Sequence, residues 1–141
     1  MTLAHDLRET LGRLVRRLRS EPGSLPVAHA TVLARLDREG PAGTSDLAAA
    51  ERMRPQSMAQ TVHDLEATGF VVRRPDPDDG RRALVELTPA GLEALTSARA
   101  RREDWLNEVL ARDFSADERK TLREALKLLE RLASAEPSRR D

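Results

Sequence analysis

The 141-residue sequence has no cysteine, no tyrosine, one tryptophan and two phenylalanines. Without cysteine the chain can form neither a disulfide nor a thiolate metal site, and it has no thiol redox switch. No apolar run approaches the roughly 18 residues that a membrane-spanning helix needs. Charges run throughout the first 20 residues, so they do not form a secretory signal. We therefore expect a soluble, cytoplasmic protein.

The chain also has no net charge, because 24 acidic side chains balance 24 basic ones. A DNA-binding domain is usually basic overall, so this total by itself argues against nucleic acid as a partner. The distribution of charge qualifies that inference, since residues 52–63 contain two arginines and no acid. Apolar residues make up 39% of the chain, and most are Leu, Ala and Val. With so few aromatic residues, this composition favours helices packed on helices over an all-β domain.

Apolar residues recur at helical spacing along most of the chain. Ser115 and Glu118 form a capping-box pattern that predicts the start of the last helix. The predicted long helices span residues 3–19, 26–39, 55–68, 89–112 and 116–133.

A further short helix is predicted from residue 44, just before helix 55–68. Thr44 is its expected N-cap, and it must end before Pro55 because the residue preceding a proline avoids helical dihedrals. Pro55 begins helix 55–68, and Gly69 ends it. Two short helices joined by a few residues form a helix-turn-helix pattern.

A β-hairpin follows, with predicted strands at residues 70–74 and 83–87 and a charged loop between them that is rich in Pro and Asp. The expected fold is mainly α with a small two-stranded wing, in the order α-α-α-α-β-β-α-α. This is a winged helix-turn-helix with extra helices at both ends. We expect one DNA-binding domain, flanked by an N-terminal dimerisation helix with its linker, C-terminal dimerisation helices and a disordered tail. Their predicted ranges are 25–91 for the DNA-binding domain, 1–24 for the N-terminal part, 92–134 for the C-terminal helices and 135–141 for the tail.

Residues 25–91 resemble the multiple-antibiotic-resistance regulator (MarR) family. The resemblance rests on Leu47-Ala48, on the run from Leu65 to Val71, and on Asp79-Gly80-Arg81 followed by the segment Leu-Thr-Pro-Ala-Gly at 87–91. The last two are similar to the family's D-x-R wing and L-T-x-x-G helix start. The chain departs from the family at the turn, where Arg52 stands at a position often held by Gly and Glu51 replaces an apolar residue.

The apolar stripes of the first and last helices need a covering surface, because isolated helices of this length are marginal in water. They can pack within the chain. The family resemblance implies instead that they interlock with a second subunit in a two-fold dimer. The predicted dimer-interface residues are Leu7, Leu11, Leu14, Leu18, Leu122, Leu126 and Leu129.

The polar side chains of helix 55–68 are expected opposite its apolar face, where amides and hydroxyls can bind base edges or phosphates. The resemblance implies that Arg81 enters a minor groove while Asp79 holds its guanidinium in place. Alternatively, helix 55–68 has an ordinary polar face, and the acids and arginines of the wing neutralise one another. The predicted DNA-contacting residues are Thr44, Ser45, Arg54, Gln56, Ser57, Gln60, Thr61, Arg73, Arg74, Asp79, Arg81 and Arg82.

We expect a homodimeric repressor that binds double-stranded DNA at a palindromic operator and is released by a small-molecule effector. The alternative is a winged-helix module that binds protein through the same helix. His29 and Trp105 are candidates for an effector pocket, although a histidine on this helix face is more often partly buried in the core and a tryptophan more often anchors a core or an interface. The sequence contains no catalytic motif, no metal-ligand cluster and no phosphate-binding loop, so we expect neither an enzyme nor a bound cofactor.

Overall fold

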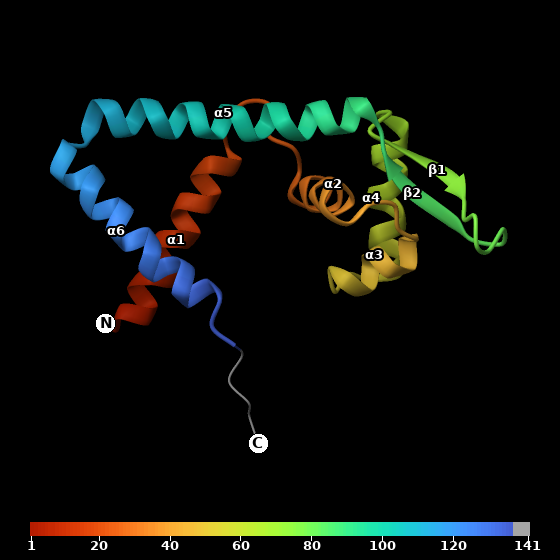
Figure 1. Cartoon of the computed structure of the whole chain (residues 1–141), viewed down its shortest axis with the longest axis horizontal. Coiled ribbons are helices and arrows are strands. Elements are labelled where there is room, and N and C mark those ends of the chain that lie inside the picture. Colours follow the sequence, from red (N-terminus) through yellow and green to blue (C-terminus); the bar gives the residue numbers. More distant parts are fainter. Residues whose placement is uncertain (137–141) are drawn as a thin grey trace, which may run out of the picture. The chain divides into compact units, whose positions relative to one another are not determined.

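The computed structural model describes residues 1–136, which form six helices and a two-stranded antiparallel hairpin (Figure 1). The element order confirms the predicted mainly α fold with a β-wing. Most of the predicted disordered tail, residues 137–141, lies outside the described residues. The elements are α1 (Leu3–Arg19), α2 (Val27–Glu39), α3 (Thr44–Ala50), α4 (Pro55–Ala67), β1 (Val71–Pro75), β2 (Ala83–Leu87), α5 (Pro89–Asp113) and α6 (Ala116–Ala133).

The chain divides into two compact units, one from Met1 to Arg102 and one from Glu103 onward. The division falls inside α5. The first unit contains the helix-turn-helix and the hairpin, and the second contains the end of α5 together with α6. Among residues 1–136, no helix is both long enough and apolar enough to cross a membrane.

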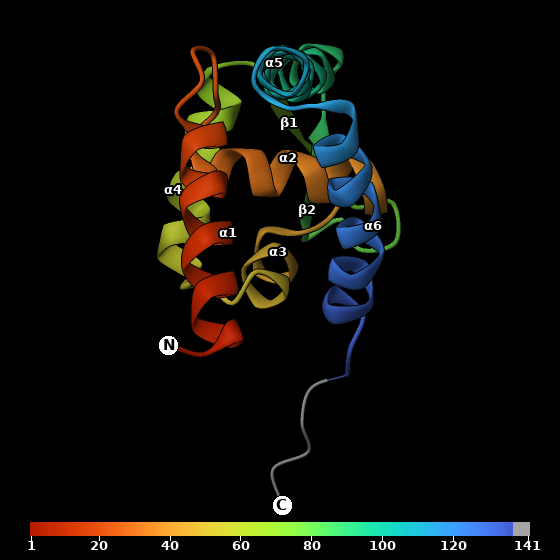
Figure 2. The ribbon, with the colours of Figure 1, turned by 90° about the vertical axis from the view of Figure 1, so that its left-hand side faces the viewer.

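The core of the first unit holds α4 against α2, α3 and the hairpin. Met58, Val62 and Leu65, the predicted inward face of α4, are completely buried, which confirms that prediction. In the side view of Figure 2, α3 lies below α2, and both helices contribute buried side chains to the same core. The position and orientation of α4 are therefore set by a continuous apolar contact surface.

Hydroxyl side chains bind backbone N–H groups at the start of α5 and α6 but not of α3. Ser115 and Glu118 form the predicted capping box, with reciprocal hydrogen bonds of 2.9 and 3.1 Å. Thr88 Oγ1 accepts a hydrogen bond from Gly91 N at the start of α5. The prediction of Thr44 as the N-cap of α3 was wrong, because Gly43 holds that position with an extended backbone and Thr44 is already helical. A Cβ at Gly43 would lie 2.5 Å from Nη2 of Arg82, so that flexible side chain would have to shift.

The start of α5 is tied to the end of α4. Thr88 Oγ1 donates a hydrogen bond to Gly69 O across 2.6 Å. Gly91 lies so close to Phe70 that a Cβ built on it would come within 2.1 Å of the Phe70 carbonyl oxygen. The Leu-Thr-Pro-Ala-Gly segment thus packs the start of α5 against the junction between α4 and β1.

Candidate nucleic-acid interface

The turn between α3 and α4 contains a strained residue. Arg52 has φ +52° and is the one non-glycine residue with positive φ among residues 1–136. This agrees with the predicted placement of Arg52 at the turn position where glycine is frequent. The left-handed region costs an L-residue roughly 1–2 kcal/mol, so the turn is formed against a local backbone preference.

The beginning of α4 is a polar surface without negative charge. Pro55 occupies the first turn of α4, and Arg54 before it is extended, as predicted. Gln56, Ser57 and Gln60 are exposed on the helix. The free N–H groups of a helix N-terminus add partial positive charge at this end, which suits a polyanionic partner.

Thr61 was predicted to face this surface, and the structure contradicts that prediction. Thr61 is only 7% exposed, and its hydroxyl donates a hydrogen bond to the Ser57 carbonyl oxygen across 3.0 Å. The reason is helical geometry, because position 61 follows Met58 by three residues and precedes Leu65 by four. Thr61 therefore lies at the edge of the apolar stripe, where packing buries it, and it has no free hydroxyl hydrogen for a nucleic acid.

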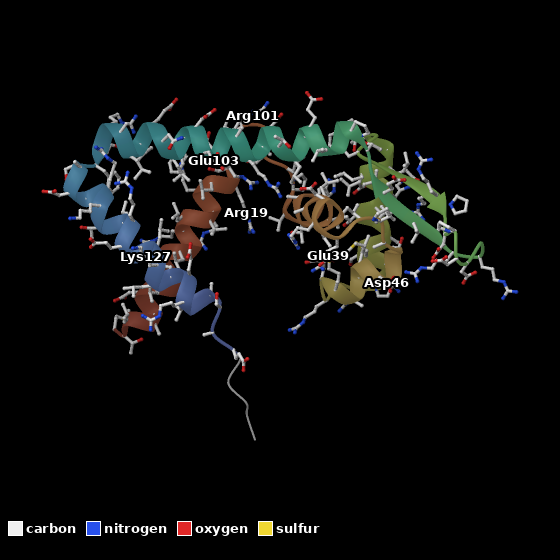
Figure 3. All side chains as sticks on the ribbon, viewed as in Figure 1. Arg19, Glu39, Asp46, Arg101, Glu103 and Lys127 are labelled. Atoms are coloured by element: carbon white, nitrogen blue, oxygen red, sulfur yellow. The ribbon has the colours of Figure 1, made fainter. Side chains whose placement is uncertain are left out.

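Three of the predicted phosphate-binding arginines are paired with carboxylates of the same chain. Arg74 Nε lies 2.5 Å from Glu86 Oε2 on the neighbouring strand, and Arg73 Nε lies 3.4 Å from Glu66 Oε2 of α4. Arg82 pairs with Asp46 in the first turn of α3, which is labelled on that helix in Figure 3. The arginines and acids around the wing thus neutralise one another to a large extent.

Arg81 differs from its neighbours. Its guanidinium makes no ion pair or hydrogen bond with any of residues 1–136. Asp79, which was expected to hold that guanidinium, instead accepts a hydrogen bond from the Arg81 backbone N–H across 3.1 Å. Asp79 therefore shapes the backbone of the wing loop, and the Arg81 side chain extends from it without a partner.

The remaining predicted contacts lie in the first turn of α3. Ser45 is exposed and Thr44 is half-buried, and neither hydroxyl caps the helix. Together with Gln56, Ser57 and Arg81, they give the first unit several exposed or half-buried polar groups with free hydrogen-bond capacity. This pattern suits a polar macromolecule better than an apolar protein surface.

Comparison with known proteins identifies the class of regulator. The model of the MarR family matches residues 25–83. A helix-turn-helix-type transcriptional regulator of Mycobacterium tuberculosis is 39% identical over 137 residues, which cover 96% of this chain and 95% of that protein. The chain belongs to the MarR family. It is a DNA-binding transcriptional regulator of the helix-turn-helix type, in a family that is not enzymatic.

Solved structures of other regulators share the fold of this MarR-family chain. The crystal structure of a regulator from Pseudomonas aeruginosa is 40% identical, with a TM-score of 0.86 and 95% of each chain covered. A mutant of MarR from E. coli is 23% identical, with a TM-score of 0.74, covering 92% of this chain and 96% of that one. A mutant of S. aureus MepR bound to an oligodeoxyribonucleotide is 19% identical, with a TM-score of 0.70, covering 94% and 99%. The last two comparisons establish similarity of fold.

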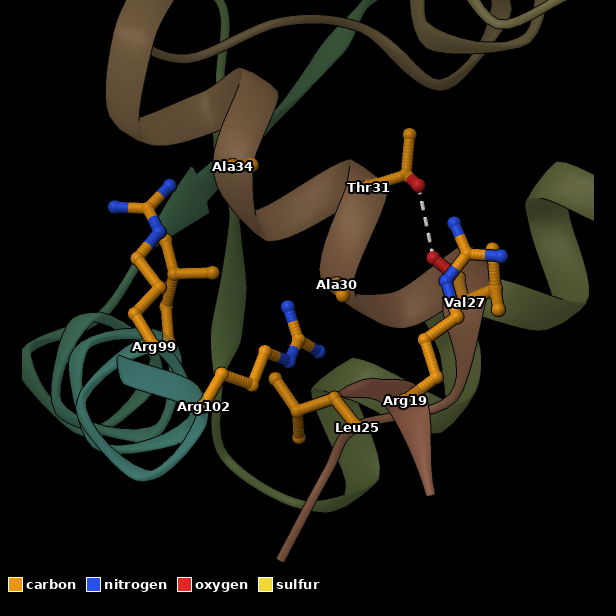
Figure 4. A pocket seen from close by; sticks show the side chains of 9 residues that line it. Arg19, Leu25, Val27, Ala30, Thr31, Ala34, Arg99 and Arg102 are labelled. Carbon is orange, nitrogen blue, oxygen red and sulfur yellow. Dashed lines mark hydrogen bonds between the residues drawn. The ribbon is translucent and has the colours of Figure 1, made fainter. Parts of the chain in front are cut away.

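A pocket of about 260 Å³ opens within the first unit of this MarR-family regulator (Figure 4). Arg99 lies 3.7 Å from Asp37, whereas the buried Nε of Arg102 has no hydrogen-bond partner among residues 1–136. The lining combines three arginines with a mainly apolar remainder: Arg19, Leu25, Val27, Ala30, Thr31, Ala34, Leu95, Arg99 and Arg102.

Neither predicted effector-pocket residue lines this pocket. His29 is half-buried, in agreement with the core alternative, and its Nε2 lies 3.7 Å from Asp64 Oδ2 of α4. Trp105 belongs to the second unit. Sequence spacing offered no way to find the three arginines, because they come from α1 and α5 and only the fold gathers them.

The terminal helices expose their apolar faces within the single chain. Neither α1 nor α6 contains a buried residue. Leu11 and Leu14 are 38% and 41% exposed, and Leu126 is 55% exposed. Leu128 and Leu132 of α6, which were not among the predicted interface residues, are more exposed still.

Proposed function

We propose that this MarR-family regulator is a homodimeric repressor that binds a palindromic operator. In this proposal, α4 enters the major groove and Arg81 enters an adjacent minor groove. The observation that carries the proposal is the exposed polar face of α4, formed by Gln56, Ser57 and Gln60. Two exposed arginines precede this helix, and residues 52–63 include no acidic side chain. Repression follows from occupying a promoter.

The exposed apolar faces of α1 and α6 support the homodimer. A two-fold dimer would present two copies of α4 about 34–36 Å apart, one helical turn of DNA, and would read two half-sites. The S. aureus MepR mutant, which has the same fold, was solved bound to an oligodeoxyribonucleotide, and this supports DNA as the partner. Residues Leu7, Leu11, Leu14, Leu18, Leu122, Leu126 and Leu129 remain the proposed interface.

Selection of bound duplexes from fragments of the source genome tests the proposal directly. We expect enrichment of a palindrome with half-sites one helical turn apart. With 6–10 phosphate contacts, affinity should fall roughly 10³–10⁵-fold between 50 and 200 mM salt. A protein-interaction module would enrich no sequence, and its affinity for its partner would change far less with salt.

The arginine-lined pocket supports control by a small-molecule effector. An anion with an apolar body would match both the cationic and the apolar parts of the lining, and it would give the orphaned Arg102 Nε a partner. Such a ligand releases DNA only if it binds the DNA-incompetent conformation more tightly than the competent one.

Thermal shift with benzoate and hexanoate tests the effector proposal, with benzyl alcohol and hexanol as uncharged controls. At 100 times its Kd, a ligand of the folded protein stabilises it by about 2.7 kcal/mol. We expect the acids to raise the melting temperature of the wild type and not of Arg102→Met. Equal effects of the acids and the alcohols, or no loss in Arg102→Met, would count against an anionic site.

A further inference from the structure

Gln60, in the middle of the exposed α4 face, is held by a second residue of the same helix. Its side-chain Nε2 donates a hydrogen bond to Asp64 Oδ1 across 2.8 Å. Residues four apart on a helix lie one above the other, so this pair runs along the surface of α4. The other amide atom, Oε1, makes no hydrogen bond with any of residues 1–136.

The acid determines which way the amide points. An ionised carboxylate is purely an acceptor, so the atom next to Asp64 has to be the amide nitrogen. The flipped amide would bring Oε1 against Asp64, where two acceptors repel each other. With one N–H donated to Asp64, Gln60 retains its second N–H and its Oε1 for a base.

The carboxylate is itself confined from the other side. Its second oxygen, Oδ2, lies 3.7 Å from His29 Nε2 of α2, whose side chain is only 22% exposed. Asp64 is 44% exposed. The three side chains thus form a row from α2, through the side of α4, to the exposed Gln60.

We propose that Asp64 is a positioning residue for base readout, because it fixes Gln60 with Oε1 and one N–H directed at the DNA. Adenine offers one donor and one acceptor to that pair of atoms in the major groove, whereas guanine offers two acceptors. Asp64 therefore determines sequence preference although it touches no base. The inference rests on the proposed placement of α4 in the major groove.

The ordinary alternative is that Gln60 and Asp64 form only a helix-stabilising pair. Such pairs are common on exposed helices and contribute to stability alone. Loss of a purely stabilising pair would lower affinity equally for every DNA sequence. A positioning role predicts that affinity differences change at one base pair of each half-site. The quantity to measure is therefore discrimination between DNA sequences.

The experiment measures the affinity of the full-length protein for its selected operator and for operators with each base pair changed in turn. Gln60→Ala should reduce discrimination at one base pair per half-site by about 5- to 150-fold. Asp64→Ala should reduce discrimination at the same base pair by about 2- to 12-fold. This is the factor expected when the Gln60 side chain has to be ordered on binding DNA. The double variant should match Gln60→Ala.

Two variants separate orientation from charge. Asp64→Asn removes the charge and offers Gln60 a donor as well as an acceptor, so the Gln60 amide can flip. It should raise overall affinity and lower discrimination at the Gln60 base pair, as Asp64→Ala does. Glu66→Gln removes a charge two residues along α4, from a side chain that pairs with Arg73, and should leave the preference unchanged. Thermal denaturation confirms that each variant is folded.

The outcomes distinguish this inference from the function on which it rests. If Gln60→Ala loses discrimination while folded Asp64→Ala retains it, or loses affinity equally for all sequences, the positioning role is overturned and the major-groove contact stands. If Gln60→Ala leaves discrimination unchanged at every base pair, Gln60 does not contact a base. The positioning role of Asp64 is then overturned as well.

Discussion

Arg35 Nε donates a hydrogen bond to Glu51 Oε1 across 2.5 Å, and this contact joins α2 to the turn between α3 and α4. Arg35 also binds Glu39 of its own helix through Nη1. These hydrogen bonds raise the pKa of Arg35 above its ordinary value, and the bond to Glu51 contributes more than the bond to Glu39. At the position where the family favours an apolar residue, an ion pair between two elements supports the turn.

The two carboxylates of this cluster should differ in their effect on stability. Glu51 is 18% exposed and connects separate elements, whereas Glu39 is 56% exposed and lies on the same helix as Arg35. We expect Glu51→Ala to lower the melting temperature and Glu39→Ala to change it little, because exposed pairs contribute little. Equal melting temperatures for the two variants would show that the contact between elements adds nothing.

The turn itself should become more stable when Arg52 is replaced by glycine. Glycine adopts φ +52° without strain, whereas alanine retains the strain of a Cβ. Both substitutions remove the guanidinium, so their difference isolates the backbone. We expect the free energy of unfolding of Arg52→Gly to exceed that of Arg52→Ala by about 1 kcal/mol in urea denaturation. Ala50→Gly, inside α3, should show the opposite sign.

Removal of the unpaired wing arginine should weaken DNA binding without affecting assembly. We expect Arg81→Ala to cost about 1–3 kcal/mol of operator affinity. Arg81→Lys should lose less affinity than Arg81→Ala, because lysine keeps the positive charge. It should still bind less tightly than the wild type, because it lacks the planar guanidinium. Arg38→Ala, an exposed arginine of α2, is the matched control and should bind as the wild type does. Unchanged affinity of Arg81→Ala in a gel-shift titration would remove Arg81 from the interface.

A charge on the apolar face of α6 should disrupt the proposed dimer. Leu126 is 55% exposed within the chain, and burying a glutamate there against a second subunit is costly. We expect Leu126→Glu to sediment as a monomer and to lose operator affinity. Lys127→Glu places the same side chain one position along α6 and should remain dimeric. A dimeric Leu126→Glu variant would locate the interface elsewhere.

The capping box of α6 should make its stability depend on pH. The hydrogen bond from Ser115 N lowers the pKa of Glu118, so the ionised form is the one that stabilises the fold. That contribution is complete above the ordinary glutamate pKa and is lost as the pH falls through the lowered one. We expect the stability advantage of the wild type over Glu118→Ala to be present at pH 7 and to disappear on acidification. An advantage that did not change with pH would show that the charge is irrelevant.

Several features of the fold followed from local sequence alone. The spacing of Met58, Val62 and Leu65 determined the buried face of α4, because a helix brings positions three and four apart to one side. The Ser115–Glu118 capping box and Gly69 marked helix ends, because the groups that satisfy helix termini lie within a few residues of them. The wing was also predicted correctly, apart from a shift of one residue in β1.

What only the tertiary structure decided involves residues that are distant in sequence or lie at the edge of a face. Thr61 sits beside the apolar stripe, and packing around Met58 and Leu65 buried it. The pairing of Arg82 with Asp46 arises where the chain at the start of β2 meets α3. The pocket arginines come together only when α1, α2 and α5 assemble. Local spacing fixes which side of an element is apolar, but long-range packing decides which charges meet. Among residues 1–136 it left the guanidinium of Arg81 without a partner, whereas Arg73, Arg74 and Arg82 are paired.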